Sequence, residues 1–114
     1  MVSLSLPLVT TYTDTVLNAL SDPTRRTVLE LVAERPRPVG ELADAVPVSR
    51  PAVSQHLRVL KDAGLLAETR VGTRHLYVLC PTGLQELASY LQRFWSLSLE
   101  SFKHAAENKE KEEL

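Results

Sequence analysis

Apolar residues recur at helical spacing in the first part of the chain. From residue 8 to residue 20 they recur every three or four positions, with threonine and aspartate between them, which predicts an amphipathic helix. Asp22 and Pro23 then favour a new helix, because Asp22 can accept hydrogen bonds from free N–H groups of the next turn and Pro23 suits the first helical position. This second helix is expected to end before the Arg-Pro-Arg-Pro run at residues 35–38, since a residue that precedes proline avoids the helical region.

The next segment predicts two helices joined by a tight turn. Residues 41–46 form a short helical pattern, and residues 47–49 form the turn after it. Ser49 is a good N-cap for the following helix, and Pro51 is tolerated there because it falls in the first turn. We expect this helix to reach Ala63, with the following glycine as its C-cap. The arrangement is a helix-turn-helix.

Beyond that glycine the pattern changes from helix to strand. Residues 65–71 and 74–79 flank Gly72 and Thr73, and the second run alternates and is rich in β-branched and aromatic residues, which predicts a two-stranded hairpin. Pro81 then begins a long final helix, roughly 35 to 40 Å in length at about 1.5 Å per residue. That is too long for so small a domain to cover. Its wide apolar stripe consists of Leu84, Leu87, Ala88, Leu91, Phe94, Trp95 and Phe102.

Length and composition bound the number of domains and the cellular setting. The 114 residues, 44% of them hydrophobic, suit one mainly α domain, which we place at residues 1–106, followed by a charged and frayed tail at 107–114. No stretch of about 18 apolar residues predicts a membrane helix, and no signal peptide is recognisable. Cys80 is the single cysteine, so no internal disulfide is possible, and we expect it to be buried or half-buried. These features predict a cytoplasmic protein without a membrane partner.

The overall charge conceals a local asymmetry. A formal charge of -1 argues against a protein that binds nucleic acid through bulk positive charge. Between residues 48 and 77, however, five basic residues and two acidic ones give a local charge of +3. Residues 107–114 carry a charge of -2. The helix-turn-helix and the hairpin therefore form a basic region beside an acidic end.

One face of the second helix of the helix-turn-helix suits DNA. On a helical wheel Val53, Leu57 and Leu60 fall together and are expected to face the core. The opposite face carries Pro51, Ser54, Gln55 and Arg58, with Lys61 at its edge and Arg50 of the first turn beside them. Glutamine suits a bidentate contact to adenine, and arginine one to guanine or a phosphate. The hairpin tip adds Arg70, Thr73 and Arg74, which suit a phosphate backbone or a minor groove, although exposed arginines on a hairpin are also ordinary solvated charges.

Several short motifs give the chain a family resemblance. They are ALSDPTRR at residues 19–26, GELA at 40–43, SQHL at 54–57, LKDAGL at 60–65 and GTR at 72–74 with Tyr77 beyond it. Together they resemble the ArsR family of bacterial winged-helix transcriptional repressors, over about residues 17–95. The resemblance implies a winged helix-turn-helix with the hairpin as its wing, and a homodimer in which the first and last helices of both subunits pack together. It also implies that an operator in double-stranded DNA is the partner.

The resemblance and the wheel together define two sets of candidate residues. The candidate DNA-binding residues are Arg50, Pro51, Ser54, Gln55, His56, Arg58, Arg70, Thr73 and Arg74. The candidate dimer-interface residues are Leu8, Tyr12, Val16, Leu84, Leu87, Leu91, Phe94, Trp95 and Phe102. His56 lies at the border of the two faces of its helix, so a packed histidine and a phosphate contact are both open for it. The aromatic residues of the last helix fit a dimer core better than a ligand pocket.

The motifs of metal sensing and of catalysis are absent from the sequence. Many members of the family carry a Cys-x-Cys motif on the helix before the turn, where residues 41–46 here contain no thiol. The paired carboxylates and histidines that other members place on the last helix are missing as well, so we expect a metal-independent protein without a cofactor. No Gly-rich phosphate loop or catalytic constellation is present, which argues against an enzyme. The alternative function is a winged-helix module that pairs with another protein through its long last helix. The sequence identifies no small-molecule effector.

Overall fold

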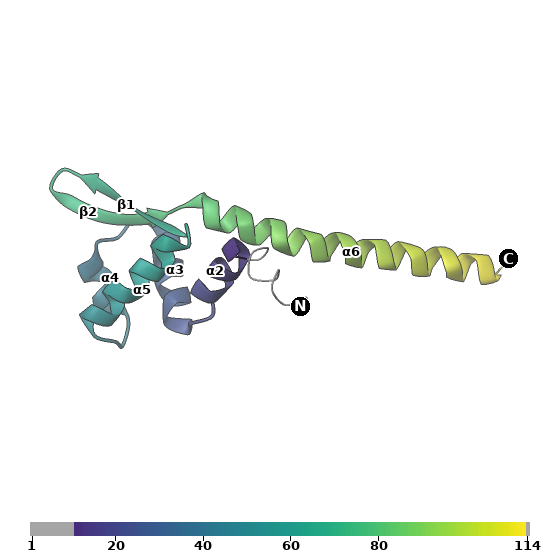
Figure 1. Cartoon of the computed structure of the whole chain (residues 1–114), viewed down its shortest axis with the longest axis horizontal. Coiled ribbons are helices and arrows are strands. Elements are labelled where there is room, and N and C mark those ends of the chain that lie inside the picture. The colour runs from purple at the N-terminus through teal and green to yellow at the C-terminus, as the bar shows by residue number, and fades with distance from the viewer. Residues whose placement is uncertain (1–10, 114) are drawn as a thin grey trace, which may run out of the picture.

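The fold is mainly α-helical with one hairpin (Figure 1). The computed structural model describes residues 11–113. In chain order the elements are α2 (Thr11–Ala19), α3 (Pro23–Glu34), α4 (Val39–Ala45), α5 (Arg50–Asp62), β1 (Leu66–Val71), β2 (Arg74–Leu79) and α6 (Pro81–Glu113). This order confirms the predicted winged helix-turn-helix. The part of the predicted first helix before residue 11, with Leu8, lies outside the described residues.

Local capping chemistry sets the ends of α3. A side-chain oxygen of Asp22 accepts a hydrogen bond from the Arg25 N–H at 2.9 Å, and Pro23 occupies the first helical turn. That backbone hydrogen bond is the main reason why the pKa of the Asp22 carboxyl lies below its usual value. The helix ends at Glu34 because Arg35, which precedes proline, has extended dihedral angles. Both ends agree with the prediction.

Helix α4 begins two residues earlier than predicted. It starts at Val39 rather than at Glu41, and the N-cap Pro38 has extended dihedral angles and makes no side-chain capping bond. Gly40 therefore lies inside the helix, although glycine has a low preference for helical conformation. In the folded chain, Leu42 of α4 is fully buried in the core cluster and α4 packs against α5, so packing compensates for the weak local preference.

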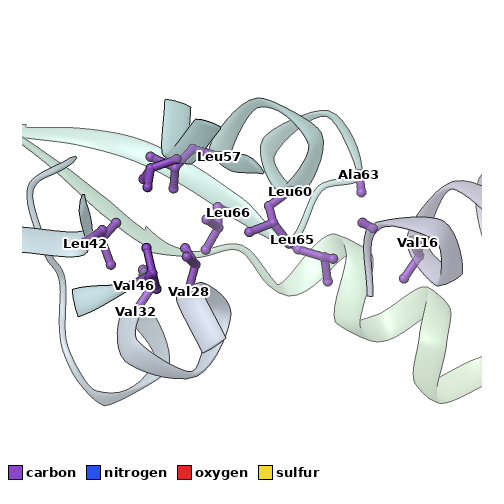
Figure 2. Packing of buried hydrophobic residues seen from close by; sticks show 12 residues of the cluster. Val16, Val28, Val32, Leu42, Val46, Leu57, Leu60, Ala63, Leu65 and Leu66 are labelled. Atoms are coloured by element: carbon purple, nitrogen blue, oxygen red, sulfur yellow. The ribbon is translucent and has the colours of Figure 1, made fainter. Parts of the chain in front are cut away.

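The core joins these helices to the start of the hairpin (Figure 2). It is a cluster of buried aliphatic side chains that includes Val28 and Val32 from α3, Leu42 from α4 and Leu57 from α5. Leu65 and Leu66 continue the cluster from the end of α5 into β1. None of the side chains buried in residues 11–113 is polar or charged. The predicted core positions Val53, Leu57 and Leu60 are at most 1% exposed, which confirms the inward face of α5.

The hairpin is anchored to the helices through the loop between α3 and α4. Strands β1 and β2 pair antiparallel from Leu66 opposite Leu79 to Val71 opposite Arg74. Arg37 forms an isolated antiparallel bridge with Tyr77, with N–H to oxygen distances of 3.1 and 2.8 Å. The Arg37 guanidinium also donates hydrogen bonds to the Leu31 carbonyl and to the carboxylates of Glu34 and Glu41. The base of the hairpin is therefore held on the helical domain.

Helix α6 extends far beyond the rest of the fold (Figure 1). Its 33 residues correspond to about 50 Å, and the whole molecule measures 71 × 39 × 27 Å. Near its start the Thr13 hydroxyl of α2 donates a hydrogen bond to Glu86 at 2.6 Å. The helix exceeds the predicted length because it continues to Glu113 through the segment expected to fray, whereas the domain boundary at residue 106 stays a prediction.

The first turn of α6 approaches the end of α5 so closely that only glycine fits. A Cβ added to Gly83 would lie 2.7 Å from the Ala63 carbonyl oxygen and 2.9 Å from that of Gly64. We therefore expect Gly83→Ala to lower the free energy of unfolding by about 1–3 kcal/mol, the usual cost of overpacking. Chemical denaturation at one fixed protein concentration measures this change.

The matched control is Gly40→Ala in α4. A Cβ there meets only the Arg50 guanidinium, at 4.0 Å, so the substitution is expected to raise the free energy of unfolding by about 0.5–1 kcal/mol. Equal effects of the two substitutions would contradict the close contact at Gly83.

Candidate nucleic-acid interface

Helix α5 presents a polar face to solvent. It begins where predicted, because the Ser49 hydroxyl accepts a hydrogen bond from the Ala52 N–H at 3.3 Å and Pro51 lies in the first turn. While Val53, Leu57 and Leu60 hold its inner face in the core, the opposite side chains are exposed. The exposed side chains are Arg50, Pro51, Ser54, Gln55, Arg58 and Lys61. The structure thus brings together the residues that the wheel placed on one face.

The wing projects beside α5 and carries the predicted cations. Gly72 has a φ of +63° while Thr73 keeps a negative φ, the pattern of a two-residue type II′ turn. Arg70, Thr73 and Arg74 are all exposed. Arg70 Nη2 lies 3.1 Å from His75 Nε2 on the paired strand. Arg70 and Arg74 therefore lie near the tip of the hairpin. The base of the hairpin is held by Arg37.

A hollow of about 540 Å³ separates α5 from the hairpin. Its lining includes Ser54, Arg58 and Lys61 of α5 together with Glu68 and Tyr77 of the hairpin. Lys61 Nζ and Glu68 Oε1 form an ion pair across it at 2.8 Å. Their hydrogen bond lowers the pKa of the Glu68 carboxyl and raises that of Lys61, and burial raises the pKa of Tyr77. The sequence analysis did not identify Glu68, because its ion pair with Lys61 joins β1 to α5 and forms only in the folded chain.

His56 is turned toward the protein rather than fully toward solvent. Its ring is half-buried, and its Nδ1 lies 3.5 Å from Arg25 Nη1. Arg25 in turn donates hydrogen bonds to the carbonyls of Ala19 and Asn18 at the end of α2. Of the two readings left open by the sequence, these contacts favour a packed histidine that supports α5.

The candidate dimer residues fall into two groups according to their exposure. Val16 is fully buried within a single chain, because α6 and the end of α5 cover α2, so it belongs to the core of the protomer rather than to an exposed surface. Leu84 and Leu87 are half-buried against the same core. Tyr12 is 37% exposed, and its hydroxyl donates a hydrogen bond to the Ala63 carbonyl at 3.2 Å.

Farther along α6 the apolar residues have no cover from their own chain. Trp95 is 61% exposed and Phe102 76%, and Leu91 and Phe94 are each more than half exposed. Leu97 and Leu99, which the prediction omitted, are also more than half exposed. Leu99 shares the spacing of the apolar stripe and could have been found from it, whereas Leu97 falls on another side of the helix. We call Leu91, Phe94, Trp95, Leu99 and Phe102 the distal stripe. On a helical wheel they continue the line of Leu84 and Leu87.

Residues 11–113 hold neither a cluster of metal ligands nor a membrane-spanning helix. No group of three or more histidine, cysteine, aspartate or glutamate side chains there gathers to hold a metal ion. Cys80 is half-buried, as expected, with its sulfur 3.7 Å from the Thr82 hydroxyl. No helix in this part of the chain is both long enough and apolar enough to cross a membrane.

The exposed helix of a helix-turn-helix, with a basic wing beside it, defines a winged helix-turn-helix DNA-binding protein. Comparison with known proteins gives the family. Residues 22–68 match the family described as "Bacterial regulatory protein, arsR family". The chain belongs to the ArsR family of transcriptional regulators and is not an enzyme.

Two relatives and one solved structure support this membership. HTH-type transcriptional regulator Rv2034 of Mycobacterium tuberculosis is 52% identical over 89 residues, which cover 78% of this chain and 83% of the relative. Transcriptional repressor SdpR of Bacillus subtilis is 35% identical over 79 residues, covering 69% and 88%. The homodimeric winged helix-turn-helix domain of Mb0332 from Mycobacterium bovis, described as a possible ArsR-family regulator, has a TM-score of 0.63 and 27% identity, covering 85% and 90%.

Proposed function

We propose that this regulator is a homodimeric repressor that binds an inverted-repeat operator in double-stranded DNA. The observation that carries the proposal is the exposed polar face of α5 beside the basic wing, both directed away from the core. A face of this composition fits the major groove, whose base edges offer distinct donors and acceptors. Such a protein acts on the chromosome, and we place it in the cytoplasm.

We assign base readout mainly to Gln55 and backbone contacts to the arginines. Gln55 is exposed on the face of α5 that points away from the core, where its amide can bind adenine in a bidentate manner. Arg50 and Arg58 flank it and suit guanine or phosphate, and Ser54 suits a phosphate. Arg70, Thr73 and Arg74 of the wing suit the neighbouring backbone or minor groove.

The distal stripe is the surface that we assign to the second copy of the chain. Contiguous exposed apolar side chains of this size are uncommon on a monomer and mark an interaction surface. The solved relative described as homodimeric supports a second copy as the occupant. Because a two-fold axis relates the two α5 helices in such a dimer, the half-sites are expected to be inverted and about 34 Å, or a multiple of that, apart.

A repressor role is supported by the relative named a transcriptional repressor. The direct test is a gel-shift experiment on the DNA upstream of the protein's own gene, with a scrambled duplex of the same length as the control. We expect preferential binding of the upstream fragment at physiological salt. Equal binding of both duplexes would contradict the proposal that the upstream DNA contains an operator for this protein.

We further propose that DNA binding is independent of metals. The motif positions of metal-sensing relatives hold no thiol in this chain, since residues 41–46 of the helix before the turn contain alanine, leucine, valine and acidic side chains. Zinc, cadmium and arsenite at micromolar concentrations are therefore expected to leave the gel shift unchanged. Release of the DNA by any of them, reversed by a chelator or a thiol, would show that the protein is a sensor.

A further inference from the structure

Two carboxylates line the hollow between α5 and the wing, on a surface that is otherwise basic. Asp62 of α5 and Glu68 of β1 both line it, together with Arg58 and Lys61 of α5. DNA bound to α5 and the wing would bring phosphates to the rim of this hollow, where carboxylates repel them. The two acidic residues therefore bear directly on the strength of DNA binding.

The two carboxylates, Asp62 and Glu68, differ in their ion pairs. Glu68 binds Lys61 at 2.8 Å through one oxygen, and its other oxygen lies 3.9 Å from His75 Nδ1. His75 in turn lies 3.1 Å from Arg70, so polar contacts run from α5 to the wing tip. Within residues 11–113, by contrast, Asp62 forms no ion pair.

The ion pair lies in a place where DNA can compete for its cation. The side chain of Lys61 is 50% exposed and that of Glu68 is 35% exposed, so both reach the surface that we assign to DNA. A lysine that neutralises a phosphate releases a counterion, whereas a lysine paired with a carboxylate brings no net charge to the interface. Whether Lys61 binds Glu68 or a phosphate in the protein–DNA complex therefore changes both the affinity for DNA and its salt dependence.

We propose that Glu68 limits the strength of DNA binding by holding Lys61 on the protein, which withholds this cation from the phosphate backbone. The inference rests on the proposed DNA-binding function and assigns to Glu68 a role in setting affinity. Weaker backbone attraction lowers binding to all sequences while base contacts by α5 stay intact. Such a limit lowers the affinity for operator and for random DNA by the same factor, so it sets the strength of DNA binding rather than the preference for the operator.

The test compares Glu68→Gln with Asp62→Asn in the full-length chain. Each variant removes one negative charge from the same hollow, but only the first frees a lysine. Binding to a random duplex and to the upstream fragment is measured by fluorescence anisotropy over a series of salt concentrations. Both positions are exposed and lie outside the core, so folding is expected to be unaffected, which circular dichroism checks.

For Glu68→Gln we expect a clear gain in affinity and a steeper salt dependence. One added phosphate contact per protomer steepens the slope of log K against log salt by about 0.9, or about 1.8 for the dimer. Relative to 1 M salt, this corresponds to roughly 20- to 60-fold tighter binding of the random duplex at about 0.1–0.2 M salt. Asp62→Asn is expected to change affinity by less than about threefold and to leave the slope unchanged. Adding Lys61→Gln to Glu68→Gln is expected to abolish the gain.

Two results would overturn the role of Glu68. One is a Glu68→Gln variant with the same slope as Asp62→Asn, or with weaker binding than the unmodified protein. The other is a loss of slope for Lys61→Gln alone, which would show that Lys61 already contacts phosphate. Equal affinity of the unmodified protein for the upstream fragment and the random duplex would instead contradict the proposed operator binding. The role of Glu68 would still be decided by the slopes of log K against log salt on the random duplex.

Discussion

Trp95→Glu is expected to convert the dimer to a monomer and to lower operator affinity by about 10²–10³-fold, toward the range of nonspecific binding. Trp95 lies in the middle of the distal stripe and is 61% exposed in a single chain. Burial of such a ring against a second copy contributes about 2–3 kcal/mol in each protomer. A carboxylate at the same place would be buried without a partner, which is strongly unfavourable. Sedimentation velocity and anisotropy on the same samples measure both effects.

Ser89→Glu is the matched control for this substitution. Ser89 is exposed on α6, away from the distal stripe on the helical wheel, so the same charge there is expected to leave both the mass and the affinity unchanged. A Trp95→Glu variant that stays dimeric with full affinity would contradict the proposed interface. An unmodified protein that is monomeric, and that associates only with a different protein, would favour the alternative function as a protein-interaction module.

Gln55→Ala is expected to remove most of the preference for the operator. A bidentate contact to a base discriminates by about 1–3 kcal/mol, and the dimer makes it twice, so operator affinity is expected to fall by about 30-fold or more. Affinity for a random duplex is expected to change less than about twofold, because Gln55 carries no charge. Anisotropy titrations on the two duplexes at one salt concentration measure the ratio.

Arg74→Ala serves as the contrasting variant. Arg74 is exposed at the wing tip and is assigned to the DNA backbone, so its loss is expected to weaken binding to both duplexes about equally and to make the salt slope shallower. If Gln55→Ala lowered the affinity for both duplexes by the same factor, the assignment of Gln55 to base readout would be contradicted.

The sequence predicts well what neighbouring residues determine. Asp22 and Ser49 fix the starts of α3 and α5 through hydrogen bonds to N–H groups three residues ahead. The turn at Gly72 requires a positive φ that glycine adopts freely. The inward and outward faces of α5 follow from helical periodicity, so the sequence alone predicts most of the candidate DNA surface.

Contacts between residues distant in sequence were not predictable in this way. Arg37 pairs with Tyr77, forty positions away, whereas the sequence around Arg37 indicates only the end of a helix. Val16 was assigned to a dimer surface because periodicity reveals an apolar face without showing which element covers it. Lys61 and Glu68 meet only because the hairpin folds back beside α5. Each of these contacts depends on the tertiary arrangement rather than on local pattern.

The most direct test of the central claim is a hydroxyl-radical footprint of the purified protein on the DNA upstream of its own gene. A dimer that inserts two α5 helices predicts two protected half-sites related by a dyad, with centres about 34 Å or a multiple of that apart. Protection is expected to disappear with Trp95→Glu. A single protected site without an inverted partner, or no specific protection at physiological salt, would contradict the dimeric operator-binding repressor.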